Sequence, residues 1–289
     1  MKTAVVTDSN SGIFGDEARK MGIHVIPMPV IIDDHTYFEN EDITQKEFFE
    51  ALMGNRNVTS SQPSPASIMD VWELVLDTAD QLIYIPMSSG LSGSYQTAAM
   101  LAEEYEGRVF VADNHRISVT MRQSVVQACR LAGEGKSADE IKKKLEEDAY
   151  KSCVFLTVET LEYFKRTGRV TPAAAALGNL LGIKPVLVTR GEKFDTYQKV
   201  RGIEKSRQGV IDALKKEIAT SYSEYKPEDL RIYCAGSFLE AADANAWQQW
   251  VSREFPGYDI HYDPLSLSIS CHTGPNAAGA AVTLSPEIG

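Results

Sequence analysis

The feature that most constrains the fold is a repeated alternation of short β-rich runs with longer amphipathic runs. In the first half, "TAVVT" (Thr3–Thr7), "LIYIP" (82–86) and "RVFVAD" (Arg108–Asp113) are typical of buried strands. The helical patterns between them are "GDEARKMG" (Gly15–Gly22), "SIMDVWELVLDTA" (67–79) and "YQTAAMLAEEY" (95–105). This β-loop-α succession predicts a parallel sheet with crossover helices, in which ligands bind beyond the carboxyl ends of the strands.

Other segments of the first half carry weaker signals. "HVIPMPVII" (His24–Ile32) is strand-like but holds two prolines, which favours an edge or irregular position. A helix over Ile43–Met53 begins at a Thr44 cap, and a charged surface helix begins at Ser137 with Glu140 at the capping-box position. We expect the first domain to end with that charged helix.

The second half repeats the alternation. Its strand-like runs are "CVFLTV" (153–158), "KPVLVTR" (184–190), "RIYCAG" (231–236) and "DIHYDP" (259–264). Helical patterns cover 206–222 and 239–255, and a hairpin turn is predicted at Gly191–Lys193. A chain of 289 residues suits two domains. We therefore predict an N-terminal domain over 1–152 and a C-terminal domain over 153–289.

Composition excludes several classes of protein. The net charge of −11 argues against nucleic acid as a partner. No stretch approaches the roughly 18 apolar residues of a spanning helix, and the N-terminus does not resemble a signal peptide, so we expect a cytoplasmic protein. The four cysteines are widely spaced and form no CxxC, which favours free thiols and no metal site. We expect no cofactor.

Three predicted loops concentrate hydroxyl groups next to glycine or proline: Thr59–Ser64, Ser88–Ser94 and Ser266–Thr273. Hydroxyls and N–H groups at a helix N-terminus form a ready anion site, and Ser92-Gly93-Ser94 directly before a helical pattern fits that geometry. Serine and glycine are also common in helix caps and turns that bind no ligand. From the residues alone, both interpretations stay open.

Two further motifs carry titratable or cationic groups. His272 lies in "CHTGP", where a sharp backbone turn is expected beside an imidazole that could bind a carboxylate or act as an acid–base group. "KRTGRV" (Lys165–Val170) places three cations around a Thr-Gly turn. Arginine suits bidentate contact with phosphate or carboxylate, but the same residues also suit the C-terminal end of a helix closed by Gly168.

Catalytic motifs are incomplete. Gly90-Leu91-Ser92 matches the start of a GxSxG nucleophile elbow, but Ser94 holds the place of the final glycine. No acid and histidine partners can be assigned to a serine triad, and no GxxxxGK[ST] motif is present. Hydroxyls with one histidine and one arginine favour binding over turnover.

At these segments the chain resembles the DegV family, the fatty-acid-binding proteins that serve bacterial fatty acid kinase. The resemblance runs over nearly the whole length, through "VVTDSNSGI", "TSSQPSP", "IPMSSGLSGSYQ", "LEYFKRTGRV" and "HTGPNAAG" in order. It implies an α/β fold of two domains, with a mostly parallel Rossmann-like sheet first, a mixed sheet second, and a lipid pocket at their interface.

The resemblance also implies a function and a site. The chain would bind a long-chain fatty acid, present its carboxylate to a separate fatty acid kinase and carry the acyl phosphate, with no catalytic centre of its own. Arg169 would engage the kinase partner or the phosphate at the pocket mouth. The ligand-binding residues would be Ser60, Ser61, Ser92, Gly93, Ser94, His272 and Thr273. We expect no membrane span, and at most transient contact with a membrane.

The chain departs from the family pattern at several positions. Ser60 stands where a threonine is usual, which leaves open whether Thr59 or Ser60 faces the ligand. Thr120, Arg122 and Asn276 stand where glycine is usual. Acyl-chain length and unsaturation, the partner kinase and the oligomeric state are left open.

Two alternatives compete with the carrier function. One is a stand-alone enzyme, either an esterase that uses Ser92 or a small-molecule kinase, and the other is a lipid-sensing regulator. For a bound carboxylate, we expect the pKa of His272 to rise on binding, with proton uptake near neutral pH.

Overall fold

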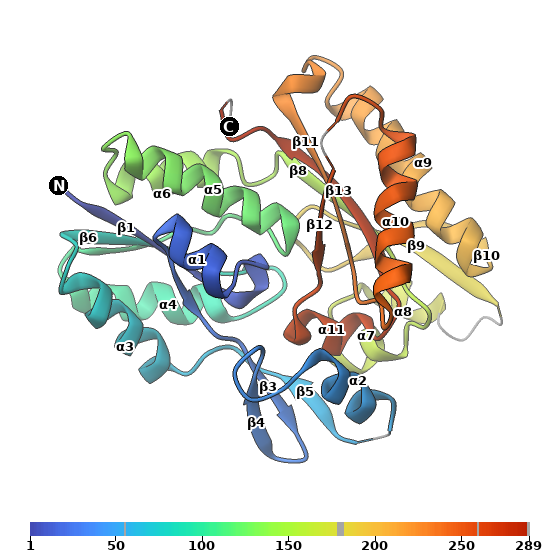
Figure 1. Ribbon diagram of the computed structural model, residues 1–289, viewed down its shortest axis with the longest axis horizontal. Coiled ribbons are helices and arrows are strands. Elements are labelled where there is room, and N and C mark those ends of the chain that lie inside the picture. Colours follow the sequence, from blue (N-terminus) through green and yellow to red (C-terminus); the bar gives the residue numbers. More distant parts are fainter. Residues whose placement is uncertain (55, 178–181, 259, 288–289) are drawn as a thin grey trace.

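The structure, a computed structural model, describes residues 1–54, 56–177, 182–258 and 260–287. It contains two larger sheets that lie side by side, one from each half of the chain, and a small third sheet below their junction (Figure 1). Across these described residues, no helix is both long and apolar enough to cross a membrane.

The first sheet is entirely parallel, as predicted. Its strand order is β2 (His24–Ile26), β1 (Thr3–Asp8), β6 (Gln81–Ile85) and β7 (Val109–Val111). Side chains alternate between its two faces: Val5 and Ile83 pack toward α5, whereas Val6 and Leu82 pack toward α3. The helices around this sheet are α1 (Gly15–Met21), α3 (Pro65–Leu76), α4 (Ser94–Ala102), α5 (Val119–Gly133) and α6 (Ala138–Glu147).

Helix α5 is not among the predicted elements, although it is the longest described helix of the first half. Most of its residues are buried, including the polar Thr120, Arg122 and Gln123. A helix that is buried on several sides shows no clean amphipathic stripe, which explains why its sequence pattern gives no clear signal.

The second sheet is mixed. Its order is β10 (Asp195–Arg201), β9 (Ile183–Thr189), β8 (Ser152–Thr157), β13 (Ala278–Leu284), β11 (Leu230–Gly236) and β12 (Ile260–Pro264). Among its described pairs, only β11–β12 is parallel, and the predicted hairpin joins β9 to β10. Helices α9 (Ile203–Ser221) and α10 (Ala241–Glu254) pack on one face. The expected start of the β12 strand, Asp259, lies outside the described residues.

The expected boundary between residues 152 and 153 falls inside β8, and the division into two domains stays a prediction. Strand β13 is not among the predicted strands, yet it is a central strand of the mixed sheet and pairs with β8 and β11. Its sequence "AGAAVTL" is rich in alanine and glycine, which are depleted in strands, so propensity gives little signal.

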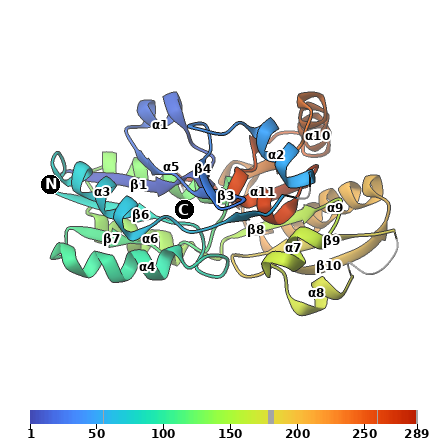
Figure 2. The same cartoon turned by 90° about the horizontal axis from the view of Figure 1, so that it is seen from below.

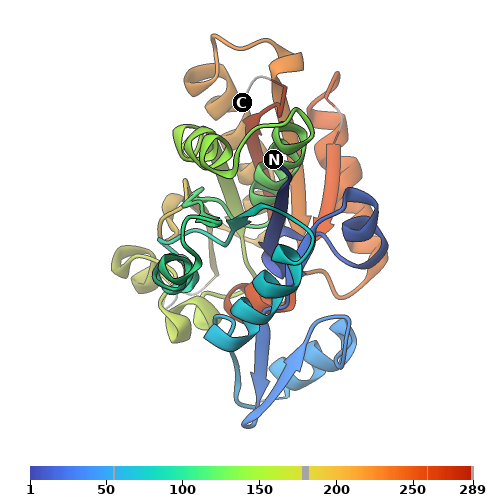
Figure 3. The same ribbon diagram turned by 90° about the vertical axis from the view of Figure 1, so that its left-hand side faces the viewer.

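The small third sheet has the order β4 (His35–Phe38), β3 (Pro29–Ile32) and β5 (Val58–Ser60). The segment 24–32 therefore holds two strands rather than one irregular strand. Pro27 separates edge strand β2 from β3, which is consistent with the preference of proline for edges and strand ends. The small sheet projects from the rest of the molecule together with α2 (Gln45–Met53), whose Thr44 capping box is present (Figure 3).

Three short helices lie beside the junction. They are α7 (Glu162–Thr167), α8 (Pro172–Ala176) and α11 (Leu267–Thr273). Segment 266–273 is thus mainly helical rather than the expected loop: Ser266 caps the helix, and Gly274, with φ +72°, ends it. Seen from below, α11 and β3 lie at the junction between the two larger sheets (Figure 2).

The turn between β9 and β10 packs tightly against the first half of the chain. Gly191 has φ +110°, and a Cβ at this position would overlap the backbone carbonyl of His115. Gly90 is equally close, because a Cβ there would lie 2.5 Å from the Gly191 carbonyl oxygen. Only glycine permits this approach of one backbone to the other.

We predict that Gly191→Ala destabilises the protein more than Gly257→Ala. Gly257 has a similar φ of +92°, but a Cβ added there would have no neighbour within 4 Å among the described residues. Both variants lose about 1–2 kcal/mol to the positive φ, and overpacking against His115 adds about 1–3 kcal/mol for Gly191→Ala. Urea unfolding of both variants measures the difference, and equal losses would contradict the close packing at this turn.

Candidate functional site

A cavity of about 250 Å³ is lined by residues from both halves of the chain. One part of its wall is polar, and the rest is apolar. The predicted site residues in the wall are Ser60, Ser61, Ser92, Gly93, Arg169, His272 and Thr273. The structure therefore brings together residues from the ends of β5, α7 and α11 and from the loop before α4.

The polar part is built around one hydrogen bond between distant segments. The Oγ of Ser60 lies 3.0 Å from Nε2 of His272, and 212 residues separate the two along the chain. Ser60 ends β5, whereas Thr59 lies one place earlier and pairs with Ile31 in the small sheet. Ser60 is thus the hydroxyl of this segment that contacts the histidine.

His272 is neutral in this setting. Burial lowers its pKa to about 3, and the positive charges of Arg169 and Arg166 act in the same direction. Its Nδ1 is buried and has no hydrogen-bond partner among the described residues. A bound carboxylate would have to raise the pKa by several units to cause proton uptake near neutral pH. We therefore replace the expectation of a charged imidazole with that of a neutral one.

The loop Ser88–Ser94 before α4, called the serine loop below, supplies the second group of polar side chains. Ser92 and Gly93 line the cavity, and α4 begins at Ser94. Ser94 itself is buried behind them, where its Oγ lies 2.9 Å from the Oγ of Ser92 and its N–H donates to the same oxygen. Ser94 therefore orients Ser92 in this structure. Ser92 and Gly93 thus bring the N-terminus of α4 to the cavity wall, and the binding of an anion by its N–H groups stays a prediction.

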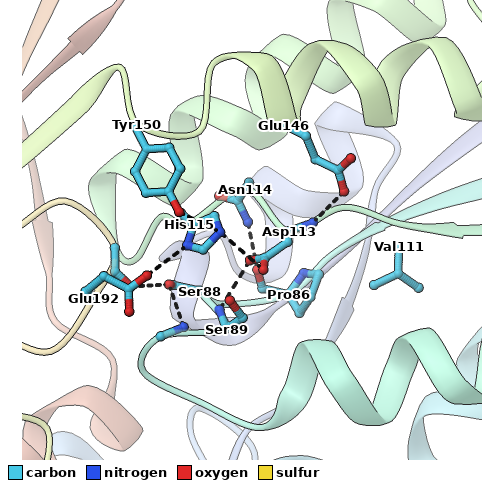
Figure 4. A network of polar contacts seen from close by, with 12 residues as sticks. Pro86, Ser88, Ser89, Val111, Asp113, Asn114, His115, Glu146, Tyr150 and Glu192 are labelled. Atoms are coloured by element: carbon cyan, nitrogen blue, oxygen red, sulfur yellow. Dashed lines mark hydrogen bonds and ion pairs between the residues drawn. The ribbon is translucent and has the colours of Figure 1, made fainter.

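The back of the serine loop is held by a polar network (Figure 4). The Ser88 hydroxyl donates to the Gly191 carbonyl, and the Ser89 N–H donates to Asp113 Oδ1 at 3.3 Å. His115 lies between Asp113 and Glu192 and stacks on the Tyr150 ring at 4.6 Å. Because Gly191 and Glu192 come from the second half, this network fixes the loop relative to both halves.

Helix α11 is held by the motif "TDSNS" (Thr7–Ser11), which covers the end of β1 and the turn after it. Asn10 is buried, and its Oδ1 accepts hydrogen bonds from the hydroxyls of Ser266, at 2.8 Å, and Ser268. Asp8 accepts from the N–H groups of Asn10 and Met87, both at 2.9 Å. Burial raises the pKa of Asp8 to about 6, and these two donors oppose that rise. The motif thus links the N-terminus to the helix that carries His272.

The segment "KRTGRV" ends a helix, as one of its two interpretations predicts, and the binding of an anion by Arg169 stays a prediction. Helix α7 ends at Thr167, and Gly168 closes it with φ +72° and a hydrogen bond to the Phe164 carbonyl. Arg169 is half-buried and donates to the carbonyls of Leu91 and Thr167. It lines the cavity and also an open depression shared with Ser92, Gly93 and Lys193. The guanidinium therefore stands between the cavity and the surface.

The departures from the family pattern have structural explanations. Ile117, Ser118 and Val119 line the cavity, whereas Thr120 turns back to hydrogen-bond with the backbone of Ile117. Arg122 forms ion pairs with Glu17 and, at 3.5 Å, with Asp263 of β12.

Asn276, the third departure, has φ +57°, in the left-handed region that favours glycine. Asparagine is among the side chains that tolerate this conformation best. Its backbone N–H donates to the Ser237 carbonyl at 2.8 Å, so the turn is kept.

Several residues of the wall are not among those predicted from the sequence. The polar ones are Gln62, Ser118 and Ser268, and the apolar ones are Met28, Met87, Leu91, Ile117, Val119, Val154, Leu156, Phe164, Phe194, Ala235, Leu265, Ile269, Gly279, Ala280 and Ala281. Gln62 follows Ser60 and Ser61 in "TSSQPSP", so its neighbours could have signalled it. The apolar residues are of the kinds that fill any core, and no local pattern separates them from it.

The arrangement suits the binding of an anion with an apolar tail better than turnover. His272 faces Ser60 rather than Ser92, and within the described residues no acidic group orients its Nδ1. A triad base needs both a nearby nucleophile and such an orienting group. No cluster of three or more potential metal ligands occurs within the described ranges.

Comparison with known proteins agrees with this geometry. The chain matches the DegV family of uncharacterised proteins over residues 2–284. It is 30% identical over 281 residues to a DegV domain-containing protein of Listeria monocytogenes, covering 96% of this chain and 97% of that protein. A relative from Caldanaerobacter subterraneus is 32% identical over 215 residues, which cover 74% of this chain and 77% of the relative.

Solved structures share the whole fold. A DegV family protein from Thermus thermophilus, described as binding fatty acid, is 31% identical with a TM-score of 0.86, covering 98% of this chain and 100% of that one. DegV from Bacillus subtilis, described as a fatty acid binding protein, is 25% identical with a TM-score of 0.85, covering 99% and 100% of the two chains. From the family match over residues 2–284 and the shared fold, we conclude that this chain belongs to the DegV family.

Proposed function

We propose that this protein binds a long-chain fatty acid in the cavity between its two halves. The observation that carries the proposal is one cavity with a polar wall around Ser60, Ser92 and His272 and an apolar wall from the mixed sheet. Relatives from Thermus thermophilus and Bacillus subtilis, described as fatty-acid-binding, support it. In this arrangement the carboxylate lies at the polar wall and the acyl chain along the apolar one.

The carboxylate receives neutral donors and two nearby cationic groups. Ser60 and Ser92 supply hydroxyls, and Gly93 supplies a backbone N–H at the start of α4, whereas the Thr273 hydroxyl lines the wall but donates to the Gly274 carbonyl at 3.1 Å. An ionised group buried without hydrogen bonds costs many kcal/mol, so such donors are required. Arg169 and Arg166, whose charges already act on His272, provide the compensating positive charge. The acyl chain supplies most of the affinity, at about 0.8 kcal/mol for each buried methylene.

We further propose that the protein presents the carboxylate to a fatty acid kinase and carries the acyl phosphate product. The support is the position of Arg169, which lines both the cavity and the open depression beside the serine loop. A kinase must reach the carboxylate from outside, and a transferred phosphate would emerge at this opening. Arginine binds phosphate oxygens with a planar fork of donors, which suits this place.

We predict that Arg169→Ala weakens binding of dodecyl phosphate, a stable analogue of an acyl phosphate, more than binding of dodecanoic acid. A hydrogen bond to a charged group contributes about 1.5–3 kcal/mol, so the loss for the phosphate should be about tenfold or more. Calorimetric titration of both ligands measures the two losses.

The control for Arg169→Ala is Arg253→Ala, which removes an exposed arginine on α10. This control should leave both affinities within about twofold of the unmodified protein, since surface substitutions have small effects. Equal losses for the acid and the phosphate in Arg169→Ala would show that the arginine interacts no more strongly with a phosphate than with a carboxylate, and would remove the support for phosphate carriage.

A separate prediction concerns the charge of His272. Its pKa of about 3 in the folded protein lies below the ordinary value of 6.5, so between these values the unfolded chain binds more protons. Folding stability therefore falls as the pH drops through this window. His272→Gln removes this titration. The free energy of unfolding of the variant, relative to that of the unmodified protein, should therefore be about 2 kcal/mol higher at about pH 5 than at about pH 7.

Urea unfolding at the two pH values tests the His272 prediction. His35→Gln is the control, because it makes the same chemical change at an exposed histidine outside the cavity. If His272→Gln and the unmodified protein lose stability in parallel between the two pH values, the imidazole is not held neutral in the folded state. The conclusion that His272 is a neutral hydrogen-bonding group of the site would then be wrong.

A further inference from the structure

The floor of the cavity is formed by three neighbouring strands of the mixed sheet. Strand β13 lies between β8 and β11, and its register aligns their side chains in rows across the sheet. The row nearest α11 consists of Ala235, Gly279 and Leu156. The next row, two residues further along β13, consists of Tyr233, Ala281 and Val154.

These rows lead away from the polar wall. His272 lies at the end of α11, and β13 begins at Ala278 and runs away from α11 toward the C-terminus (Figure 1). Residues two apart on a strand share a face and are separated by about 6.6–6.8 Å. Ala281 therefore lies one such step deeper than Gly279. Beyond it, the third row consists of Arg231, Thr283 and Ser152, which are polar.

The centre of both apolar rows is hollow because β13 carries very small side chains there. Gly279 and Ala281 both line the cavity, and Ala281 is fully buried. The alternate residues of β13, among them Val282 and Leu284, pack against the core beneath α9 and α10. The small side chains on the cavity face thus leave room that larger ones would fill, as sheet faces in cores are otherwise closely packed.

We propose that Ala281 sets the maximum length of the acyl chain. This inference rests on the proposed binding of a fatty acid. A chain whose carboxylate lies at Ser60 and His272 passes over Gly279 and reaches Ala281, and the polar third row forms the end of the apolar floor. Ala281 is a better selector than Gly279, where even a Cβ would lie 3.1 Å from Leu156 Cδ1.

The test is the affinity of Ala281→Leu for saturated acids from decanoic to stearic acid. Leucine adds three carbons and should exclude about three methylenes of the ligand, each of which contributes about fourfold in affinity. Stearic acid should bind about fiftyfold more weakly than to the unmodified protein. Decanoic acid should lose less affinity than stearic acid, because fewer of its methylenes reach the substituted position.

A smaller substitution and a surface control show whether the effect of Ala281→Leu comes from chain length or from misfolding. Ala281→Val adds two carbons and suits a strand, so it should move the length limit less, with a loss of about fifteenfold for stearic acid. Ala242→Leu makes the same chemical change as the main variant at an exposed position of α10 and should leave the whole series unchanged. Circular dichroism and thermal unfolding show whether each variant is folded.

The outcomes separate this inference from the proposed function. If the unmodified protein binds none of the acids, the proposed function fails. If it binds them and the folded Ala281 variants lose affinity equally for short and long acids, or not at all, Ala281 does not measure chain length. A loss that grows with chain length supports the proposal.

Discussion

The site depends on one contact, the hydrogen bond between Ser60 and His272 across 212 residues of sequence. It joins the end of a small antiparallel sheet to a short helix of the second half, so neither half contains the polar wall alone. The contact also sets the electrostatics, because a histidine buried this deeply stays neutral and acts as a hydrogen-bonding group rather than a cation. Positive charge for an anionic ligand then has to come from Arg169 and Arg166, which lie close enough to affect the histidine.

Keeping this contact requires the two halves to be fixed against each other, and two connections do so. On one side, Asn10 binds the serines that begin α11. On the other side, Gly191 packs against the backbone of His115 and accepts the Ser88 hydrogen bond. Both connections involve backbone or short polar groups, which allow little adjustment. The cavity between them therefore has a defined shape, and its apolar floor is formed by β8, β13 and β11, with small residues on β13 at the centre.

Much of the fold could be predicted from the sequence, and the failures have physical causes. Strands β1, β6 and β7 are buried on both faces and read as continuous apolar runs. Strand β13 escapes prediction because its small residues have low strand propensity, and two of them, Gly279 and Ala281, line the cavity. Helix α11 resembles a loop in sequence, since serines alternate with apolar residues. Its Ser266 cap and the hydrogen bonds of Ser266 and Ser268 to the distant Asn10 hold it in place. Local sequence patterns thus fail to predict two elements, β13 and α11, that line the cavity.

The candidate site was predictable only where side-chain chemistry is unusual for its position. Hydroxyls beside glycine, a histidine before a turn and an arginine after one all line the cavity. The apolar wall could not be found, because its residues are assembled from distant strands. The most direct test of the central claim is mass spectrometry of the denatured protein as purified from bacteria. The account predicts a long-chain fatty acid near one equivalent per chain, whereas a protein that carries no fatty acid and binds none when it is added would contradict it.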